Sequence, residues 1–349
     1  MKEASTRYFS IDAFKMIASQ LVVLHHIAAY GPIADAVQLS SPALISWLYD
    51  YARMAVQIFF VIGGYLAARS MIPCGSNISS LSLALMGRYF RLAIPFVIAL
   101  IFAIACATLA RYWMADDFIP ATPSLPQFLA HVFFLQGVLN FDTILAGAWF
   151  IAIDFQLFLL MTCIVWLGGK AANSKSVIMA IITLISASSL FWFNRSARFD
   201  DWAVYFFGAY AMGASAYWAG QRGQINVFWL WLNTALAGVA LVVDFRARIL
   251  IAIFVAIMLH LSKGVNLNPT FIGYQVVHYL GQISFSLFLI HFSILMLVNA
   301  IFSNLNFFNP LLGPIFMFAT ILLSLVAANI FYHWVEMPIA KMVKNKLKP

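Results

Sequence analysis

The sequence predicts an all-α integral membrane protein with about ten transmembrane helices, because its composition is apolar and its apolar segments are long. Hydrophobic residues make up 64% of the 349 residues and charged residues 9%, and the mean hydropathy is +0.92. Soluble proteins carry about 25% charged residues, so this composition excludes a water-soluble domain. The apolar segments are continuous, whereas barrel strands alternate polar and apolar residues, so helical spans are expected.

Ten apolar segments follow one another along the chain, and each is expected to cross the bilayer. Their approximate bounds are 11–31, 49–72, 90–110, 145–167, 176–193, 201–219, 225–243, 247–261, 277–301 and 311–335. Prolines break the longest connecting stretch, 111–146, in which 128–139 is expected to form a short interfacial helix. Residues 1–349 are expected to form a single transmembrane domain with no appended soluble domain, so any chemistry would lie within the bundle.

The basic residues predict the orientation of the bundle. With the N-terminus in the cytoplasm, 14 of the 20 lysines and arginines fall on the cytoplasmic side, as the positive-inside rule requires. Ten spans then place the C-terminus in the cytoplasm as well. The net charge of +8 therefore reflects topology and does not indicate nucleic-acid binding. The three cysteines show no metal-ligand or redox spacing, and no metal is expected.

The first span carries a polar stripe. At about 100° per residue, Asp12, Lys15, Ser19 and His26 lie on one face of the helix, whereas His25 lies about 100° away. Ionisable groups within a span are costly, so they indicate a functional site by default. The alternative is that the histidines lie near an interface and reach water.

A second group of polar residues is expected in the outer half of the bundle. Asp154 in the fourth span and His26 match in depth, and a carboxylate bonded to one imidazole nitrogen leaves the other free as a base. Ser284 and His291, seven residues apart in the ninth span, share a face. The alternatives are that Asp154 partners a buried arginine or a water, and that His291 is a packed core histidine.

A third group consists of cations at the expected inner face. Arg88 and Arg91 lie three residues apart at the start of the third span and point the same way, with Arg69 and Lys15 nearby. Several cations around one opening suit a polyphosphate ligand. The alternative is that these cations only follow the positive-inside rule, with side chains that reach the water.

Six segments of the chain, in order, resemble motifs of the acyltransferase 3 family of integral-membrane enzymes, which O-acylate sugars of bacterial cell envelopes and related glycans. The segments are IDAFKMIASQLVVLHH, QIFFVIGGYLAARS, RYFRLAIP, WFIAIDFQLFLL, LGQISFSLFLIHFSIL and FYHWVEMPIAK. Each motif alone is weak, but six in the right order on the expected spans make a fairly specific match. The resemblance implies ten spans with both termini in the cytoplasm.

The resemblance also implies roles for individual residues. The family's arginine and histidine of the first span fall on Lys15 and His26, which selects His26 over His25. Its arginine pair, associated with the acyl-coenzyme A donor, falls on Arg88 and Arg91. Its fourth-span glutamate falls on Asp154, and Gln156 matches as well. Lysine in place of arginine and aspartate in place of glutamate are departures, as are Phe158 for tyrosine and Gly63 for serine.

The function expected from these features is that of a bacterial inner-membrane O-acyltransferase. It would move an acyl group, acetyl by resemblance, from acetyl-coenzyme A to a hydroxyl of a cell-envelope glycan or lipid-linked sugar. His26 would act as general base or acyl carrier with Asp154 orienting it, and Lys15, Arg88 and Arg91 would bind the donor. The supporting polar groups are Asp12, Gln156, Ser284 and His291.

Two alternatives to this function remain open at the level of sequence. Ionisable groups in several spans also fit a transporter or exporter of an envelope saccharide or other small solute, although no inverted repeat or paired broken span is evident. A relative that has lost catalysis, given Lys15 and Asp154, is the second alternative.

Overall fold

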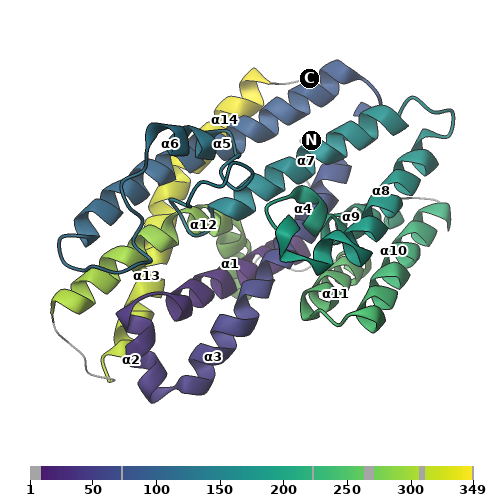
Figure 1. The fold of residues 1–349 in the computed structure, drawn as a ribbon. Helices are drawn as coiled ribbons and strands as arrows, with labels where there is room; N and C mark the ends of the chain where they lie inside the picture. The colour runs from purple at the N-terminus through teal and green to yellow at the C-terminus, as the bar shows by residue number, and fades with distance from the viewer. Residues whose placement is uncertain (1–8, 72–73, 222–223, 263–270, 306–310, 348–349) are drawn as a thin grey trace.

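The computed structural model describes residues 9–71, 74–221, 224–262, 271–305 and 311–347, and every regular element within them is helical (Figure 1). The first half contains α1 (Phe9–Ala29), α2 (Pro32–Ser40), α3 (Pro42–Tyr51), the 3-10 helix η1 (Ala52–Ala55), α4 (Val56–Met71), α5 (Ile78–Ala110), α6 (Leu125–Val132) and α7 (Ala148–Gly168). The second half contains α8 (Ser174–Phe191), the 3-10 helices η3 (Phe193–Arg195) and η4 (Ala197–Phe199), α9 (Ala203–Ala219), α10 (Gln224–Val243), α11 (Ala247–Leu261), α12 (Ile272–Asn304), α13 (Gly313–Phe331), the π-helix η5 (Tyr332–Glu336) and α14 (Met337–Lys346).

The all-helical membrane architecture expected from the sequence is confirmed. Among the described residues, seven helical segments are long and apolar enough to span a membrane, and there are eight if α1 and α2, which meet at a bend of 91°, count as one broken span. The remaining two of about ten expected spans coincide with α9 and α11, whose 17 and 15 residues are short for a crossing. Lys2, Arg7, Arg222, Lys263 and Lys348, which entered the expected orientation, lie outside the described residues.

Two helix boundaries differ from the expected ones. The third span begins at Ile78 and not near residue 90, because Asn77 caps the helix by accepting a hydrogen bond from the Ser80 amide at 3.2 Å. The short helix expected at 128–139 is α6, which begins at Leu125 behind a capping box formed by Ser124 and Gln127. It ends at Val132, and the positive φ of Phe134, 60°, is incompatible with a continuing helix.

Close packing between α4 and α9 forms the centre of the bundle. A Cβ on Gly64 would lie 1.9 Å from the Tyr210 carbonyl oxygen, and a Cβ on Gly213 would lie 1.8 Å from that of Val61. The two backbones therefore touch at a distance that only glycine permits, as small residues allow between membrane helices. Helices α8, α10 and α11 pack around α9, while α1 and α13 pack on α12, on opposite sides of the view in Figure 1.

Candidate active site

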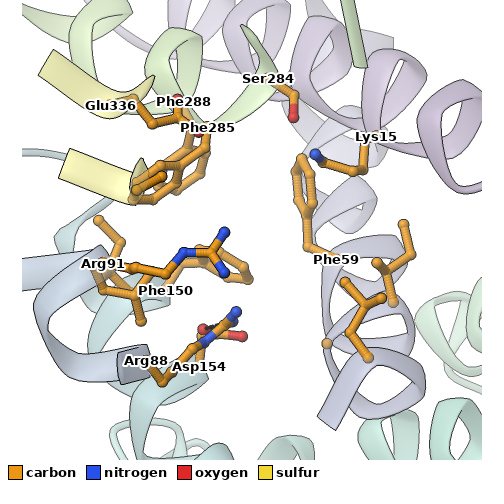
Figure 2. Close-up of a pocket in the computed structure, with 16 residues that line it drawn as sticks. Lys15, Phe59, Arg88, Arg91, Phe150, Asp154, Ser284, Phe285, Phe288 and Glu336 are labelled. Atoms are coloured by element: carbon orange, nitrogen blue, oxygen red, sulfur yellow. Dashed lines mark hydrogen bonds and ion pairs between the residues drawn. The ribbon is translucent and has the colours of Figure 1, made fainter. Parts of the chain in front are cut away.

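A cavity of about 200 Å³ lies among α1, α4, α5, α7, α12 and the C-terminal segment. Five ionisable groups line it (Figure 2), three cations and two carboxylates, namely Lys15, Arg88, Arg91, Asp154 and Glu336. Its apolar wall is aromatic and consists of Phe59, Phe150, Phe285 and Phe288. We call this space the cation cavity. Its lining carries a formal net charge of +1, from three cations and two anions.

Arg88 and Asp154 form an ion pair at one side of the cation cavity. Nη2 of Arg88 donates to Oδ2 of Asp154, and the arginine and aspartate side chains are 29% and 7% exposed. Arg91 enters the same cavity one turn further along α5, as the spacing of the two arginines predicts (Figure 2). Lys15 enters it from α1.

Asp154 and His26 were expected to pair because of their matched depth, but in the structure each bonds a different residue. Asp154 bonds Arg88, and the hydrogen bond of His26 goes to His291. The reason is the length of α5: its early start places Arg88 ten residues into the helix, roughly 15 Å from its first turn. The guanidinium therefore reaches the level of Asp154, while the arginine side chain stays 29% exposed.

Glu336 is a member of the cation cavity that the sequence did not single out. Its Oε2 accepts a hydrogen bond of 2.5 Å from Ser286 Oγ. It ends the π-helix η5, an interruption that shifts the helical register and often accompanies functional sites. An acidic residue close to the end of the last apolar segment was the available signal, but the register shift that turns it inward is not readable from the sequence.

His26 and His291 form a buried pair, and the donor and acceptor of each of their hydrogen bonds can be assigned. His291 Nδ1 lies 2.9 Å from the Leu287 carbonyl oxygen, which only accepts, so this nitrogen carries a proton. In the neutral imidazole, His291 Nε2 is then an acceptor, and the 2.7 Å contact requires His26 Nδ1 to donate. The ring planes differ by 2°, which is compatible with a hydrogen bond in the plane of both rings. His26 Nε2 is therefore the unprotonated nitrogen, which is the form that acts as a base.

The histidine pair lies between the cation cavity and a second cavity near the end of α1. On one side, the His291 ring packs at 6.2 Å from Phe288, which lines the cation cavity. On the other, His26 packs at 5.8 Å from Tyr30 and 6.1 Å from Phe292, which line the second cavity. The pair thus contacts residues that line each of the two cavities.

The remaining sequence-predicted residues have structural partners. Asp12 Oδ2 bonds His278 Nδ1 at 2.7 Å and joins α1 to α12. Gln156 Oε1 accepts from the Ala203 amide at 3.1 Å and caps the start of α9. Ser284 lines the cation cavity and donates to Gly281. His25, on a different face from His26, donates to the Leu48 carbonyl oxygen at 3.2 Å and holds α3 against α1.

These features define a multi-pass helical membrane protein whose ionisable groups converge inside the bundle around a histidine pair. The chain matches the model of the acyltransferase 3 family, described as an acyltransferase domain, over residues 8–329. It belongs to this family and is an acyltransferase that takes an acyl donor. No curated protein and no solved structure matches the chain at a significant level.

Proposed function

We propose that this acyltransferase moves an acetyl group from acetyl-coenzyme A to a hydroxyl of a cell-envelope glycan or lipid-linked sugar, in the inner membrane of a bacterium. The observation that carries the proposal is the free Nε2 of His26, held in the basic tautomer between two cavities. A transfer reaction needs a base within reach of donor and acceptor together, and a position between two spaces supplies that.

The reaction follows from the hydrogen-bond direction of the histidine pair. Nε2 of His26 takes the proton of the acceptor hydroxyl while its oxygen attacks the thioester carbonyl carbon. The new C–O bond forms, the C–S bond breaks, and the coenzyme A thiolate receives the proton from His26. In the covalent variant, Nε2 itself attacks the thioester carbonyl carbon, the C–S bond breaks and the thiolate leaves. The acceptor hydroxyl then takes the acyl group as the C–N bond breaks, and its proton passes to the thiolate. Both routes use the same nitrogen, and His291 holds it in place in both.

The donor is proposed to enter the cation cavity, where Lys15, Arg88 and Arg91 face its phosphates. Asp154 is assigned a different role from the one that its depth suggested: it holds the Arg88 guanidinium in the cavity and does not orient His26. Glu336, fixed by Ser286, lies on the same lining. The two carboxylates lower the net charge of the lining to +1, so the phosphates would replace interactions that the cations make with these carboxylates.

Binding and turnover measured separately test the proposal. The purified protein in nanodiscs is expected to bind acetyl-coenzyme A and to hydrolyse it slowly. Arg88→Ala/Arg91→Ala is expected to lose binding, whereas His26→Ala keeps binding and loses hydrolysis. His25→Asn is the matched control, because its amide retains a donor for Leu48, and it is expected to hydrolyse like the wild type.

A monodisperse, folded wild-type protein that binds no acetyl-coenzyme A would contradict the proposal. Transport assays with envelope saccharides would then be the next step, since a carrier moves its substrate unchanged and needs no thioester.

A further inference from the structure

The cavity on the far side of the histidine pair is large and acidic. It encloses about 740 Å³ between the end of α1, the connection from α5 to α7, and α12. This lies within the range of about 300–1,000 Å³ that is typical of ligand sites. Its lining includes the carboxylates Asp116, Asp117 and Asp142 and the aromatic rings Tyr30, Trp149 and Phe292, and it contains no lysine, arginine or histidine. We call it the acidic cavity.

The acidic cavity adjoins the proposed catalytic base. Tyr30 and Phe292 lie 5.5 Å apart in a T-shaped arrangement, and both contact the His26 ring. His26 is only 7% exposed, and within the described part of the chain Nε2 makes no hydrogen bond. This nitrogen makes no hydrogen bond among the described residues, and it belongs to a residue more than nine-tenths buried whose ring packs against two lining rings. It is an observation independent of the carboxylates, and it favours the approach of a reacting group from this side.

Hydrogen bonds fix the walls of the acidic cavity before any ligand binds. Arg111 donates to the Pro120 carbonyl oxygen and, at 3.2 Å, to Thr122 Oγ1, which holds the segment after Asp116 and Asp117. Gln127 Nε2 donates to the Asp142 carbonyl oxygen at 2.9 Å. A pre-formed site costs less ordering on binding, so these bonds favour a binding surface over a loose loop.

The charge of the cavity selects among ligand classes. Carboxylates accept hydrogen bonds from hydroxyl and amine groups, and the aromatic rings offer apolar area to the face of a sugar ring. The described residues contain no group of three or more His, Cys, Asp or Glu that could hold a metal ion, so the carboxylates do not converge on a cation. A phosphate, sulfate or carboxylate on the ligand would meet three like charges, and among the described residues the only cation bonded to the wall, Arg111, already donates to Pro120 and Thr122.

We propose that the acidic cavity is the acceptor site and that the saccharide unit it holds carries no acidic group. The inference rests on the proposed function and names the class of its acceptor: a neutral or amine-bearing sugar whose hydroxyl reaches His26 past Tyr30 and Phe292. The anionic part of a lipid-linked or polymeric acceptor lies outside this cavity.

The first experiment tests the location of the site. Membranes of source cells that lack the endogenous protein receive wild type, Asp142→Asn or Asp116→Asn/Asp117→Asn, and [14C]acetyl-coenzyme A. Transfer of label to envelope glycan is expected to fall roughly tenfold or more in both variants, because each removes charged hydrogen-bond acceptors. Their affinity for acetyl-coenzyme A, measured in nanodiscs, is expected to match the wild type. Asp35→Asn, an exposed carboxylate of α2 outside the cavity, is the control and is expected to transfer normally.

The second experiment tests the class of the acceptor. Mass spectrometry of labelled fragments from the wild-type reaction is expected to locate the acetyl group on a sugar residue without carboxylate, phosphate or sulfate. Label on a uronic or phosphorylated residue would overturn the inference, and so would normal transfer by both aspartate variants. If the wild type neither transfers label nor binds the donor, that result contradicts the proposed function itself, on which the inference rests.

Discussion

At the scale of single residues, the chemistry of the site depends on the direction of two hydrogen bonds. The Leu287 carbonyl oxygen can only accept, so it fixes the tautomer of His291, and His291 in turn fixes that of His26. His291 touches no proposed substrate directly. It is a positioning residue, whereas Nε2 of His26 is the proposed point of contact with the reacting atoms.

Replacement of His291 tests whether it accepts the hydrogen bond from His26. His291→Gln presents an amide oxygen that can accept from His26 Nδ1, whereas His291→Leu presents none. We expect His291→Leu to lower kcat about 100-fold, within the range of general-base contributions, and His291→Gln to recover a large part of that loss. The Kd for acetyl-coenzyme A is expected to be unchanged in both variants. Equal losses in the two variants would show that His291 merely fills space.

Replacement of Asp154 separates its two possible roles. If Asp154 holds Arg88, Asp154→Asn raises the Kd for acetyl-coenzyme A tenfold or more and leaves kcat at saturating donor within a few-fold of wild type. The variant is also expected to lose about 3 kcal/mol of stability, the lower end for a broken buried pair, because Arg88 is 29% exposed. Donor titration of the hydrolysis rate separates Kd from kcat. Unchanged donor affinity with a large fall in kcat would instead favour a role beside His26.

At the scale of helices and loops, the positions of the site residues depend on contacts between elements that are distant in sequence. Gly64 and Gly213 bring α4 and α9 into backbone contact. Gly63 continues this contact, since a Cβ there would lie 3.1 Å from the Tyr210 ring and 3.2 Å from Asp154 Oδ1. The packing of α4 on α9 therefore also fixes the side of the cation cavity where Asp154 lies.

Gly64→Ala tests the contact between α4 and α9. Its Cβ would lie 1.9 Å from a backbone oxygen, which cannot turn aside like a side chain, so we expect a loss of about 1–3 kcal/mol, as in overpacked cores. Gly238→Ala in α10, where no atom lies within 4 Å of the added Cβ, is the control and should gain up to about 1 kcal/mol of helix propensity. Unfolding in mild detergent measures both. A Gly64→Ala variant as stable as the wild type would contradict the observed close approach.

We expect the stability of the loops around the acidic cavity to depend on pH, because α6 carries a buried histidine. The buried His131 donates from Nδ1 to the Gln127 carbonyl oxygen at 2.8 Å and accepts at Nε2 from the Ile144 amide at 3.2 Å. Burial lowers the pKa of His131 below its usual value of 6.5. The fold thus favours the neutral ring, so its stabilising contribution is complete above about pH 6.5 and is lost as the pH falls toward the lowered pKa.

Thermal unfolding between pH 7.5 and 5 measures this effect. The wild type is expected to lose stability across the acidic part of the range, and His131→Gln, which does not titrate, should lose less. Identical pH profiles for the two proteins would exclude His131 as the source.

The sequence predicted the inward-facing groups better than their partners. Helical periodicity placed Asp12, Ser19 and His26 on one face, and all three are buried. The possibility that Asp154 partners a buried arginine was among the alternatives, and the structure has that pair. The preferred partner was wrong because depth was judged from span ends, and α5 begins about twelve residues earlier than its apolar pattern suggests.

Other features could not be placed from the sequence. The pairing of His26 with His291 joins residues 265 positions apart, and the position of Glu336 depends on a π-helical register shift. The acidic cavity is assembled from α1, α12 and an irregular connection whose prolines predicted only a break in structure. Periodicity reports which face of a helix is buried, but it does not report which helix lies opposite.

At the scale of the whole molecule, the two cavities lie toward opposite ends of α1. Lys15 lines one, and Tyr30, the residue after the last of α1, lines the other; the helix from Lys15 to Ala29 rises roughly 21 Å. The charges differ as well: the cation cavity carries a net positive lining and the acidic cavity a negative one. This arrangement suits a donor and an acceptor that approach from opposite faces of the membrane and meet at the histidine pair.

The most direct test is therefore the sidedness of the reaction. Inverted vesicles from source cells expose the cytoplasmic face, whereas right-side-out vesicles expose the opposite face, and both receive [14C]acetyl-coenzyme A. We expect label on envelope glycan in inverted vesicles only, and none when the vesicles carry His26→Ala. Equal labelling in both orientations, or labelling that survives His26→Ala, would contradict a transfer between the two cavities through His26.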